Sequence, residues 1–494
     1  MNRSWKNLGE FLGFLEGKGE LVRVHRTVDP RLEMSELALR AVRNGGPALM
    51  FDPPKGSLGP VVMNLLGTEQ RIAWALGGET LKEPRERIEG LLRLKPPGGL
   101  GEMLSDLSGT IENLQSLRAL GPKRVSRAPC QEVIRENGDL DPLPIITCWP
   151  KDGGPTITLP LVITKNPETG QQNVGIYRLQ RYGKDTLGMH WQIHRVGAEN
   201  YRRYARRGEA MPVAVVVGAD PTTVFSGLAP VPEGISKFAF AGLLRGKPVE
   251  LVPCRTVDLE VPAEAEFVLE GTVHPGEHHV EGPFGDHTGY YSLPEEFPVM
   301  HVGCITHREN PVYLTTVTGK PPTEDAVLGM AVGDLFLPVI RMVLPEVVDL
   351  FLPMEGLFIN VGIVSIRKSF PQHARKVMHA LWGLGQLMFV RYLIVVDHDV
   401  NPRNLREVLY RVGLQADPRE DVTITDGPVD QLSISNRLEN VGGKMGIDAT
   451  KKGPEDGYPR PWPEEATMDA AVLRRVDGIL NELPELRKAL TPRA

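Results

Sequence analysis

Apolar residues near the start of the chain recur first at the spacing of an α-helix and then in short continuous runs. Helical spacing ends at a Gly-Lys-Gly turn, and a second helical pattern ends at Gly45-Gly46-Pro47, as is usual for glycine and proline. The pattern predicts two helices and two strands in alternation: residues 5–15, 21–24, 32–44 and 48–51. We therefore expect an N-terminal α/β region over residues 1–115.

The middle of the chain changes to short β-rich runs that are separated by glycine and proline turns. Such runs occupy residues 157–163, 213–217 and 267–273. Many short strands with few helices between them are typical of a barrel-like β domain. We place this domain at residues 116–320.

Beyond residue 325, apolar strands and amphipathic helices alternate again. The pattern predicts strands at 356–366 and 393–397, and helices at 373–387 and 401–412. Such alternation is typical of a parallel sheet that is covered by helices. We place a C-terminal α/β domain at residues 321–494, with a final helix from Asp469.

The bulk composition excludes several classes of protein. A chain of 494 residues exceeds the roughly 250–300 residues of a single core, so two or three domains are expected. A net charge of −6 gives no reason to expect nucleic acid as a partner. Four scattered cysteines without a CxxC pair indicate free thiols in a reducing compartment. Prolines and charges interrupt the longest apolar stretch, so we expect a cytoplasmic protein without stable membrane insertion.

One part of the β domain is unusually dense in polar and aromatic side chains. Residues 173–180 are followed by residues 188–195, which contain two histidines and a tryptophan. Because alternate residues of a strand share a face, we expect Asn173 and Tyr177 on one face and Arg178 on the other. A strand pair with one solvated face is the structural alternative.

A second segment gathers four histidines and three carboxylates between His274 and Tyr290. Imidazoles and carboxylates are the usual ligands of zinc or iron, so a metal-dependent hydrolase using the loop from His274 to His287 is one interpretation. A hydrated surface loop is another. A third interpretation pairs Glu281 with Asp286, because neighbouring acids raise each other's pKa and one could then act as a general acid.

A third segment, from Gly442 to Thr450, is rich in glycine and carries Lys444. Glycines let the backbone approach an anion, and Lys444 could meet a phosphate. The spacing differs from that of a P-loop, so this segment alone is a weak signal.

Taken together, these strings resemble the UbiD family of 3-polyprenyl-4-hydroxybenzoate carboxy-lyases over nearly the whole chain. Several long matches occur in the same order, which makes the resemblance specific. They are Gly45 to Leu49, Asn173 to Arg178, Trp191 to Arg195, Phe240 to Gly246, Glu281 to Tyr291 and Lys444 to Thr450.

The resemblance implies an N-terminal α/β part, a central split β-barrel related to flavin reductases, and a C-terminal α/β domain that mediates oligomerisation. It implies prenylated FMN as cofactor, supplied by a flavin prenyltransferase, with manganese and often potassium at the phosphate. A homo-oligomer, from dimer to hexamer, is expected. An apolar stripe on a predicted helix offers contacts, unless it packs on its own sheet: Leu335, Phe336, Val339, Ile340, Val343 and Leu344.

The resemblance also assigns roles to individual positions. Asn173 and His194 match metal ligands, and the residues Arg178, Glu281 and Asp286 match the catalytic trio. The positions that match cofactor-binding segments are Asn173, Ile176, Tyr177, Arg178, His190, Trp191, Gln192, His194, Arg195, Val196, Lys237 and Lys444.

One position departs from the family pattern. The third metal ligand of the family is a glutamate at the start of a helix, and the matching residue here is Lys237. A protonated lysine has the same net charge as a divalent ion with one glutamate, so we expect Lys237 to replace the manganese ion. Glu233 is the alternative ligand, and an inactive flavin-binding protein is the alternative function.

The trio is chemically reasonable on its own. Arg178 can hold a carboxylate with its planar fork, and Asp286 can deliver the proton that is needed after CO2 leaves. We therefore expect a non-oxidative decarboxylase of an aromatic or α,β-unsaturated acid. A prenylated hydroxybenzoate or a naphthoate of quinone biosynthesis is the expected substrate.

Overall fold

The computed structural model describes three stretches of the chain, residues 3–92, 120–231 and 235–490. These residues divide into two compact units. The first comprises the chain up to Lys368 together with His373–Thr450, and the second comprises Ser369–Gln372 with the described tail from Lys451.

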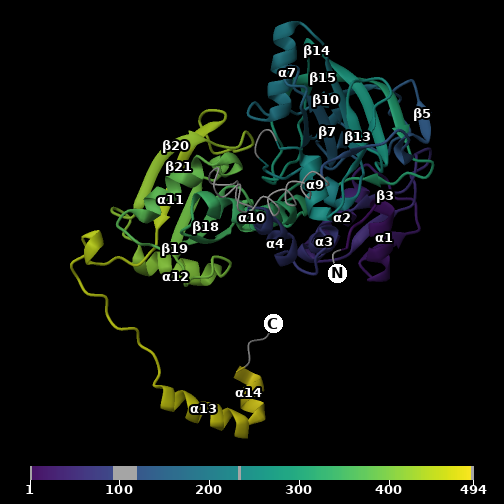
Figure 1. Ribbon diagram of the computed structural model, residues 1–494. Helices are drawn as coiled ribbons and strands as arrows, with labels where there is room; N and C mark the ends of the chain where they lie inside the picture. Colours follow the sequence, from purple (N-terminus) through teal and green to yellow (C-terminus); the bar gives the residue numbers. More distant parts are fainter. Residues whose placement is uncertain (1–2, 93–119, 232–234, 491–494) are drawn as a thin grey trace, which may run out of the picture. The chain divides into compact units, whose positions relative to one another are not determined.

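The N-terminal region has the α/β organisation that the sequence predicts (Figure 1). Its elements are α1 (Leu8–Gly17), β1 (Leu21–Val24), α2 (Glu33–Arg43), β2 (Ala48–Phe51), β3 (Val61–Met63), α3 (Glu69–Ala75) and α4 (Lys82–Leu92). Within the described residues, β1, β2 and β3 form one sheet with a distant strand, β16 (Tyr313–Leu314). The predicted boundary near residue 115 lies outside the described residues.

A large antiparallel sheet forms the β domain (Figure 1). Within the described residues its strand order is β6-β9-β10-β15-β14-β11-β7-β8, and β5 pairs with β15. The strands are β5 (Val133–Arg135), β6 (Thr156–Ile157), β7 (Pro160–Lys165), β8 (Gln172–Ile176), β9 (Leu179–Arg181), β10 (Thr186–Met189), β11 (Met211–Val217), β14 (Phe267–Glu281) and β15 (Glu295–His307). The mixed α/β multidomain fold is confirmed, whereas kinship with flavin reductases rests on the sequence resemblance.

The central strands of the large sheet are buried on both faces, because their side chains pack into two apolar cores. In β11, Val213 and Val215 pack in one core, whereas Ala214 and Val216 pack in the other. A strand that is buried on both faces needs apolar side chains at every position, which explains the continuous apolar run in this part of the sequence.

Helices and a small sheet complete the β domain. The small sheet has the order β13 (Glu260–Pro262), β12 (Glu250–Pro253) and β4 (Lys123–Arg124), and the helices are α7 (Val196–Arg207), α8 (Pro221–Ser226) and α9 (Lys237–Arg245). The Ser236 side chain caps α9 by accepting a hydrogen bond from the backbone N–H of Ala239. This cap places Lys237 at the first helical position.

The histidine-rich segment is mostly a strand and not the loop that the sequence predicts. β14 extends to Glu281, so three of the four histidines lie on its exposed end. A register shift after Val273 accommodates Pro275 and Gly276 as a bulge, which is why these two residues do not end the strand. His287 lies in the loop that follows.

The C-terminal domain contains a mixed sheet. Its described strands are β17 (Val347–Phe351), β18 (Val361–Ile366), β19 (Tyr392–Asp397), β21 (Val441–Asp448) and β20 (Val422–Pro428), in that spatial order. β18, β19 and β21 run parallel, whereas β17 and β20 are antiparallel edges. The predicted parallel sheet is right at the centre and wrong at both edges, where each edge strand pairs with the next strand of the chain and the described residues between them form no α-helix.

Two helices cover opposite faces of this sheet. Val364 and Val395 pack with α11 (His373–Trp382), and the adjacent residues Ile363 and Val396 pack with α12 (Leu405–Gln415). This alternation is the period of a β-strand that is covered on both sides. The Figure 1 ribbon shows both helices beside the sheet.

Three C-terminal elements have other bounds than the sequence predicts. β18 begins only at Val361, because Leu357 and Phe358 adopt positive φ angles in the preceding turn. α11 ends at Trp382, before a glycine, and α12 begins at Leu405 after an Asn404 cap. Local turn chemistry decides these bounds, and the apolar pattern alone does not reveal it.

The helix α10 (Glu324–Val343) packs in two cores. Leu335 and Phe336 lie in a core of the N-terminal and β regions, whereas Leu337 and Ile340 lie in the C-terminal core. The predicted apolar stripe is therefore mostly buried within its own chain, and it is not the free oligomer surface that we expected. By length and composition α10 is the one described helix that could cross a membrane, but half of its apolar window is buried.

The second unit contains the predicted final helix. α13 (Ala470–Glu482) begins after Asp469, whose side chain caps it, and α14 (Pro484–Leu490) follows. Three large apolar residues of α13, Leu473, Val476 and Ile479, are exposed.

Candidate active site

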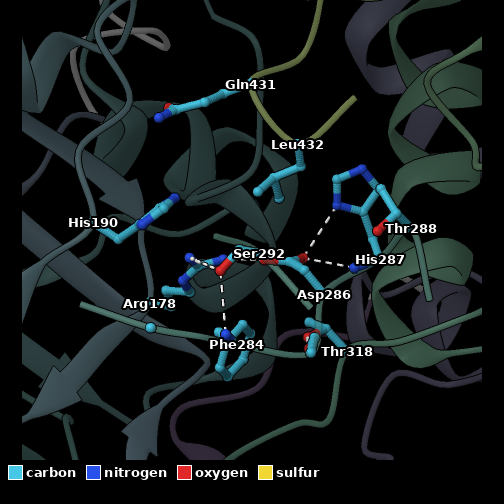
Figure 2. A network of polar contacts seen from close by, with 12 residues as sticks. Arg178, His190, Phe284, Asp286, His287, Thr288, Ser292, Thr318, Gln431 and Leu432 are labelled. Atoms are coloured by element: carbon cyan, nitrogen blue, oxygen red, sulfur yellow. Dashed lines mark hydrogen bonds and ion pairs between the residues drawn. The ribbon is translucent and has the colours of Figure 1, made fainter. Parts of the chain in front are cut away.

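Arg178 lies at the centre of a buried polar network (Figure 2). Its Nε and Nη2 donate to the two carboxylate oxygens of Glu281 at 2.8 and 3.0 Å. Its Nη1 forms an ion pair with Asp286, and Nη2 also donates to Ser292 Oγ at 3.3 Å. The guanidinium carbon lies 4.6 Å from the centre of the Phe284 ring. The fold thus brings the predicted trio into direct contact.

The loop that carries Asp286 is fixed by its neighbours. The backbone N–H of Gly285 donates to Asp152 at 2.9 Å, and Thr318 Oγ1 donates to the Gly285 carbonyl at 3.0 Å. A Cβ at Gly285 would lie 2.2 Å from Trp149 Cδ1, so the indole leaves room for glycine only. The close packing of this turn positions the carboxylate that follows it.

Both carboxylates of the trio are held ionised. Burial alone would raise the pKa of Glu281, but His190 and Arg178 lower it to about 2. Burial opposes ionisation of Asp286 too, yet Arg178 and His287 hold its pKa well below the usual range. The prediction that the two acids raise each other's pKa is therefore wrong for this arrangement, because the guanidinium lies between them.

His190 follows β10 and is buried against Glu281, with 3.2 Å between Nδ1 and Oε2. Burial and the charge of Arg178 lower the pKa of His190, so the ring is neutral at pH 7. An ionised carboxylate can only accept, so Nδ1 carries the hydrogen and Nε2 is an acceptor. Nε2 is buried and has no protein partner, so it can accept a hydrogen bond from a bound molecule.

His287 is a residue of the network to which the sequence analysis gave no role of its own. Its backbone N–H and Nδ1 lie 2.7 and 3.1 Å from Asp286 Oδ1, and its Nε2 lies 3.9 Å from Asp430 Oδ1. Burial alone would lower its pKa, but Asp286, Asp430 and Asp325 raise it to about 9. The imidazole is therefore a cation at neutral pH. The adjacent Asp286 was a visible signal, whereas the two other acids come from distant parts of the sequence.

Predicted cofactor-binding residues gather around the first turn of α7. Arg195 is the N-cap residue, and the Gly197 N–H donates to the Tyr177 hydroxyl at 3.4 Å. A Cβ at Gly197 would lie 2.9 Å from the Trp191 indole nitrogen, so glycine permits this close approach. The free N–H groups of a helix N-terminus suit an anion such as a phosphate.

The remaining residues of these segments lie beside this turn. The Tyr177 ring lies close to Gly175 of β8, because a Cβ at Gly175 would be only 2.5 Å from it. Ile176 packs against a buried core, Gln192 contacts Arg195 at 3.4 Å, and Val196 is the first residue of α7.

Several polar atoms of these segments are buried and have no protein partner. They are Asn173 Nδ2, His190 Nε2, Trp191 Nε1 and His194 Nε2. An unpaired buried polar group costs about 1–3 kcal/mol, so such a set indicates a polar ligand. The residues therefore fit a flavin nucleotide, whose ring and phosphate offer hydrogen-bond donors and acceptors.

The same region does not fit a divalent metal. Lys237, at the expected third ligand position, donates from Nζ to the Gly227 carbonyl at 2.6 Å. Burial, with the charge of Arg195, lowers the pKa of Lys237 to about 8, which leaves the ammonium mostly charged at pH 7. Among the described residues, no group of three His, Cys, Asp or Glu side chains could hold a metal ion. Glu233 lies outside the described residues, and the hydrolase interpretation gains no support.

Lys444 lies on β21 of the C-terminal domain. Its Nζ donates to the backbone carbonyls of Met388 and Val390. It thereby fixes the segment that carries Phe389, whose ring lies 4.5 Å from that of His194. Contact between Lys444 and a cofactor phosphate stays a prediction.

The site combines a buried guanidinium between two carboxylates with buried polar atoms that have no protein partner. Such a site suits an enzyme that acts on acids and transfers protons. The chain belongs to the UbiD family of carboxy-lyases. Models described as the N-terminal, Rift-related and C-terminal domains of 3-octaprenyl-4-hydroxybenzoate carboxy-lyase match residues 12–91, 123–321 and 326–449.

Known relatives cover nearly the whole chain. An uncharacterized protein of Archaeoglobus fulgidus is 50% identical over 482 residues, which are 97% of this chain and 99% of that one. Vanillic acid decarboxylase of Sedimentibacter hydroxybenzoicus, in closed form, is 28% identical with a TM-score of 0.86, over 97% and 99% of the two chains.

The UbiD-class enzyme HmfF of Pelotomaculum thermopropionicum is a third similar protein. In complex with FMN it is 32% identical to this chain, with a TM-score of 0.78 over 95% and 98% of the two chains. An evolved dimeric form of HmfF in complex with prenylated FMN is 30% identical, with a TM-score of 0.77 and the same coverage.

Proposed function

We propose that this protein is a prenylated-FMN-dependent, non-oxidative decarboxylase of an aromatic or α,β-unsaturated carboxylic acid. The observation that carries the proposal is the buried contact of Arg178 with both Glu281 and Asp286. The similar vanillic acid decarboxylase is named for an aromatic acid, which supports this substrate class. Within it, we propose a hydroxybenzoate, prenylated or not, or a naphthoate of quinone biosynthesis.

Each member of the trio has a distinct role in this proposal. Glu281 fixes the plane of the Arg178 guanidinium through two parallel hydrogen bonds. Arg178 in turn orients Asp286, which delivers the proton that replaces CO2. All three side chains are buried, so bulk water is kept from the reacting carbon.

Prenylated FMN would supply an electron-accepting centre for the π-electrons of the substrate. Trp191, His190, His194 and Asn173 would hold it with the polar atoms that have no protein partner. The N-terminus of α7 and Lys237 would face its phosphate, because both present positive charge in a buried setting. The complexes of HmfF with FMN and prenylated FMN support this assignment.

We propose that Lys237 takes the place of the manganese ion. A divalent ion about 4 Å from the Lys237 ammonium would be repelled by about 8 kcal/mol at an effective dielectric constant of ~20. The two neutral ligands, Asn173 and His194, add no negative charge that would offset this repulsion. Potassium binding stays a prediction.

Elemental analysis of the cofactor-loaded protein tests this replacement. We expect no stoichiometric manganese in the wild type and a gain of manganese in Lys237→Glu, which restores a carboxylate ligand. Stoichiometric manganese in the wild type, unchanged by the substitution, would show that Lys237 points elsewhere and that another residue completes the site.

Expression with and without a flavin prenyltransferase tests the proposed function. We expect a shifted flavin absorbance and CO2 release only after co-expression. A shifted absorbance without CO2 release from any aromatic acid would favour the second candidate, an inactive flavin-binding protein. Lys237 is the observation behind that candidate, because it removes the expected metal ligand.

We also propose the domain division 1–115, 116–320 and 321–494, and a soluble protein of the cytoplasm. The separate sheets of the N-terminal, β and C-terminal regions support the division. The burial of half of the apolar window of α10 supports solubility, because a core helix of this kind needs no membrane.

A further inference from the structure

Decarboxylation consumes a proton, and this site must store one. At neutral pH the substrate enters as R–COO⁻; when the C–C bond breaks, the electron pair stays on carbon and CO2 leaves. One proton must then form the new C–H bond, so that R–COO⁻ + H⁺ gives R–H + CO2. Asp286 is placed to hand on this proton, but Arg178 and His287 keep its carboxylate ionised in the resting enzyme.

His287 is the neighbouring group that can hold the missing proton. Its Nδ1 lies 3.1 Å from Asp286 Oδ1, the same oxygen that accepts its backbone N–H at 2.7 Å. The side chain is 12% exposed, and its ring lies 5.7 Å from that of Phe358. Figure 2 shows the imidazole beside Asp286 at the edge of the network.

Resting on the proposed function, we infer that His287 is a proton relay: its imidazolium passes the Nδ1 proton to Asp286, which delivers it to the carbon that has lost CO2. The electron pair of the broken C–C bond takes up this proton, and the neutral imidazole regains one from solvent. Asp286 returns to its ion pair with Arg178, so one cycle consumes one solvent proton.

The charged groups around His287 favour this use. Asp286 lies on the same loop as His287, Asp430 follows β20, and Asp325 lies in the first turn of α10. These three acids face the imidazole, and the cation of Arg178 is separated from it by Asp286. They hold the pKa of His287 at about 9, so that the relay is loaded at neutral pH.

Asp430 belongs to the C-terminal domain, so the relay draws on both large parts of the chain. The next residue, Gln431, donates to Glu295 of the β domain at 2.6 Å, which ties this segment to the site. Asp430 therefore adds to the raised pKa of His287, beside the larger effect of Asp286, while this segment lies against the β domain.

The variant His287→Asn separates a relay from a structural role. The amide of asparagine can still donate to Asp286, but it cannot store a proton. In the cofactor-loaded enzyme we expect kcat to fall by about 10²–10⁴-fold while the flavin spectrum stays unchanged. The matched control is His301→Asn, which changes an imidazole paired with Glu277 outside the site and should leave kcat unchanged.

The dependence of the decarboxylation rate on pH is a second, independent test. The relay works only when protonated, so the wild-type rate should fall as the pH rises through about 9. Asp430→Asn removes one of the anions that raise this pKa and keeps an acceptor for the Leu432 N–H, so it should move the fall to lower pH. Wild-type kcat and an unchanged alkaline limb in His287→Asn would overturn the relay.

NMR titration of histidine-labelled protein without cofactor tests the charge itself. We expect one imidazole resonance, absent from His287→Asn, to titrate well above the ordinary pKa of about 6.5. If the His287 imidazole is neutral at pH 7, the relay is wrong, whereas the proposed function is not affected. A loaded wild type that decarboxylates no acid would instead defeat the proposed function.

Discussion

Arg178 uses both edges of its guanidinium, so we expect Arg178→Lys to be nearly as damaging as Arg178→Ala. An ammonium keeps the charge but cannot hold Glu281 with two parallel bonds and reach Asp286 as well. Loss of such preorganised donors typically lowers kcat by about 10²–10³-fold. Steady-state kinetics beside Arg181→Lys, a partly exposed arginine on β9, provides the control. A near-normal rate in Arg178→Lys would show that charge alone suffices.

Asp286→Asn should abolish turnover while the cofactor still binds. The amide is almost the same size as the carboxylate, but it cannot pass a proton, so the rate should fall by at least about 10²–10⁴-fold. Flavin absorbance reports binding, and CO2 release reports turnover. Asp141→Asn, which alters an exposed arginine pair, is the matched control. Wild-type-like rates in loaded Asp286→Asn would remove Asp286 from the proton path.

At this scale the sequence revealed which residues matter but not their charge states. Residue types and family likeness pointed to Arg178, Glu281 and Asp286, and the structure brings them together. Their pKa values depend on a cation between the acids and on Asp430, more than 140 positions from His287. No local pattern encodes such distances. The sequence analysis therefore placed the stored proton on one of the two carboxylates, whereas the structure favours the imidazole of His287.

At the scale of elements, the loop between β14 and β15 depends on a glycine. Gly285→Ala would place its Cβ 2.2 Å from Trp149 Cδ1, and such overpacking costs about 1–3 kcal/mol. We expect the loop to shift and Asp286 to lose its position. The loss of kcat should therefore be larger than the loss of folding stability alone would explain. Gly303→Ala on β15, with no neighbour within 4 Å of the added Cβ, should change neither. Equal kinetics and melting temperatures for the two variants would contradict this account.

Apolar periodicity predicted most elements well, and its failures have local causes. α1, β1, α2 and β2 lie where the pattern placed them, because β1 is a clear apolar run and the other three are followed closely by glycine or proline. β14 runs through Pro275 and Gly276 because a bulge absorbs both residues. The antiparallel edges of the C-terminal sheet depend on pairing partners, which a one-chain pattern does not specify.

At the scale of the whole molecule we expect a homo-oligomer whose contacts come mainly from the C-terminal domain. The stripe on α10 is mostly buried, so exposed Leu409 and Leu414 of α12, with Ile424 of β20, are the better candidates. Light scattering at micromolar concentration should give a mass above that of one chain. We expect Leu409→Glu to lower this mass and Val22→Glu, at an exposed position of β1, to leave it unchanged. A monomeric wild type would refute the prediction.

The central claim is that this chain releases CO2 from an aromatic or unsaturated acid with prenylated FMN. The direct measurement uses acids that carry ¹³C in the carboxyl group, and it compares loaded wild type, wild type without cofactor, and loaded Asp286→Asn. We predict stoichiometric ¹³CO2 and decarboxylated product from the loaded wild type alone. No ¹³CO2 from the loaded wild type with any hydroxybenzoate, naphthoate or cinnamate, or equal release without cofactor, would contradict the account.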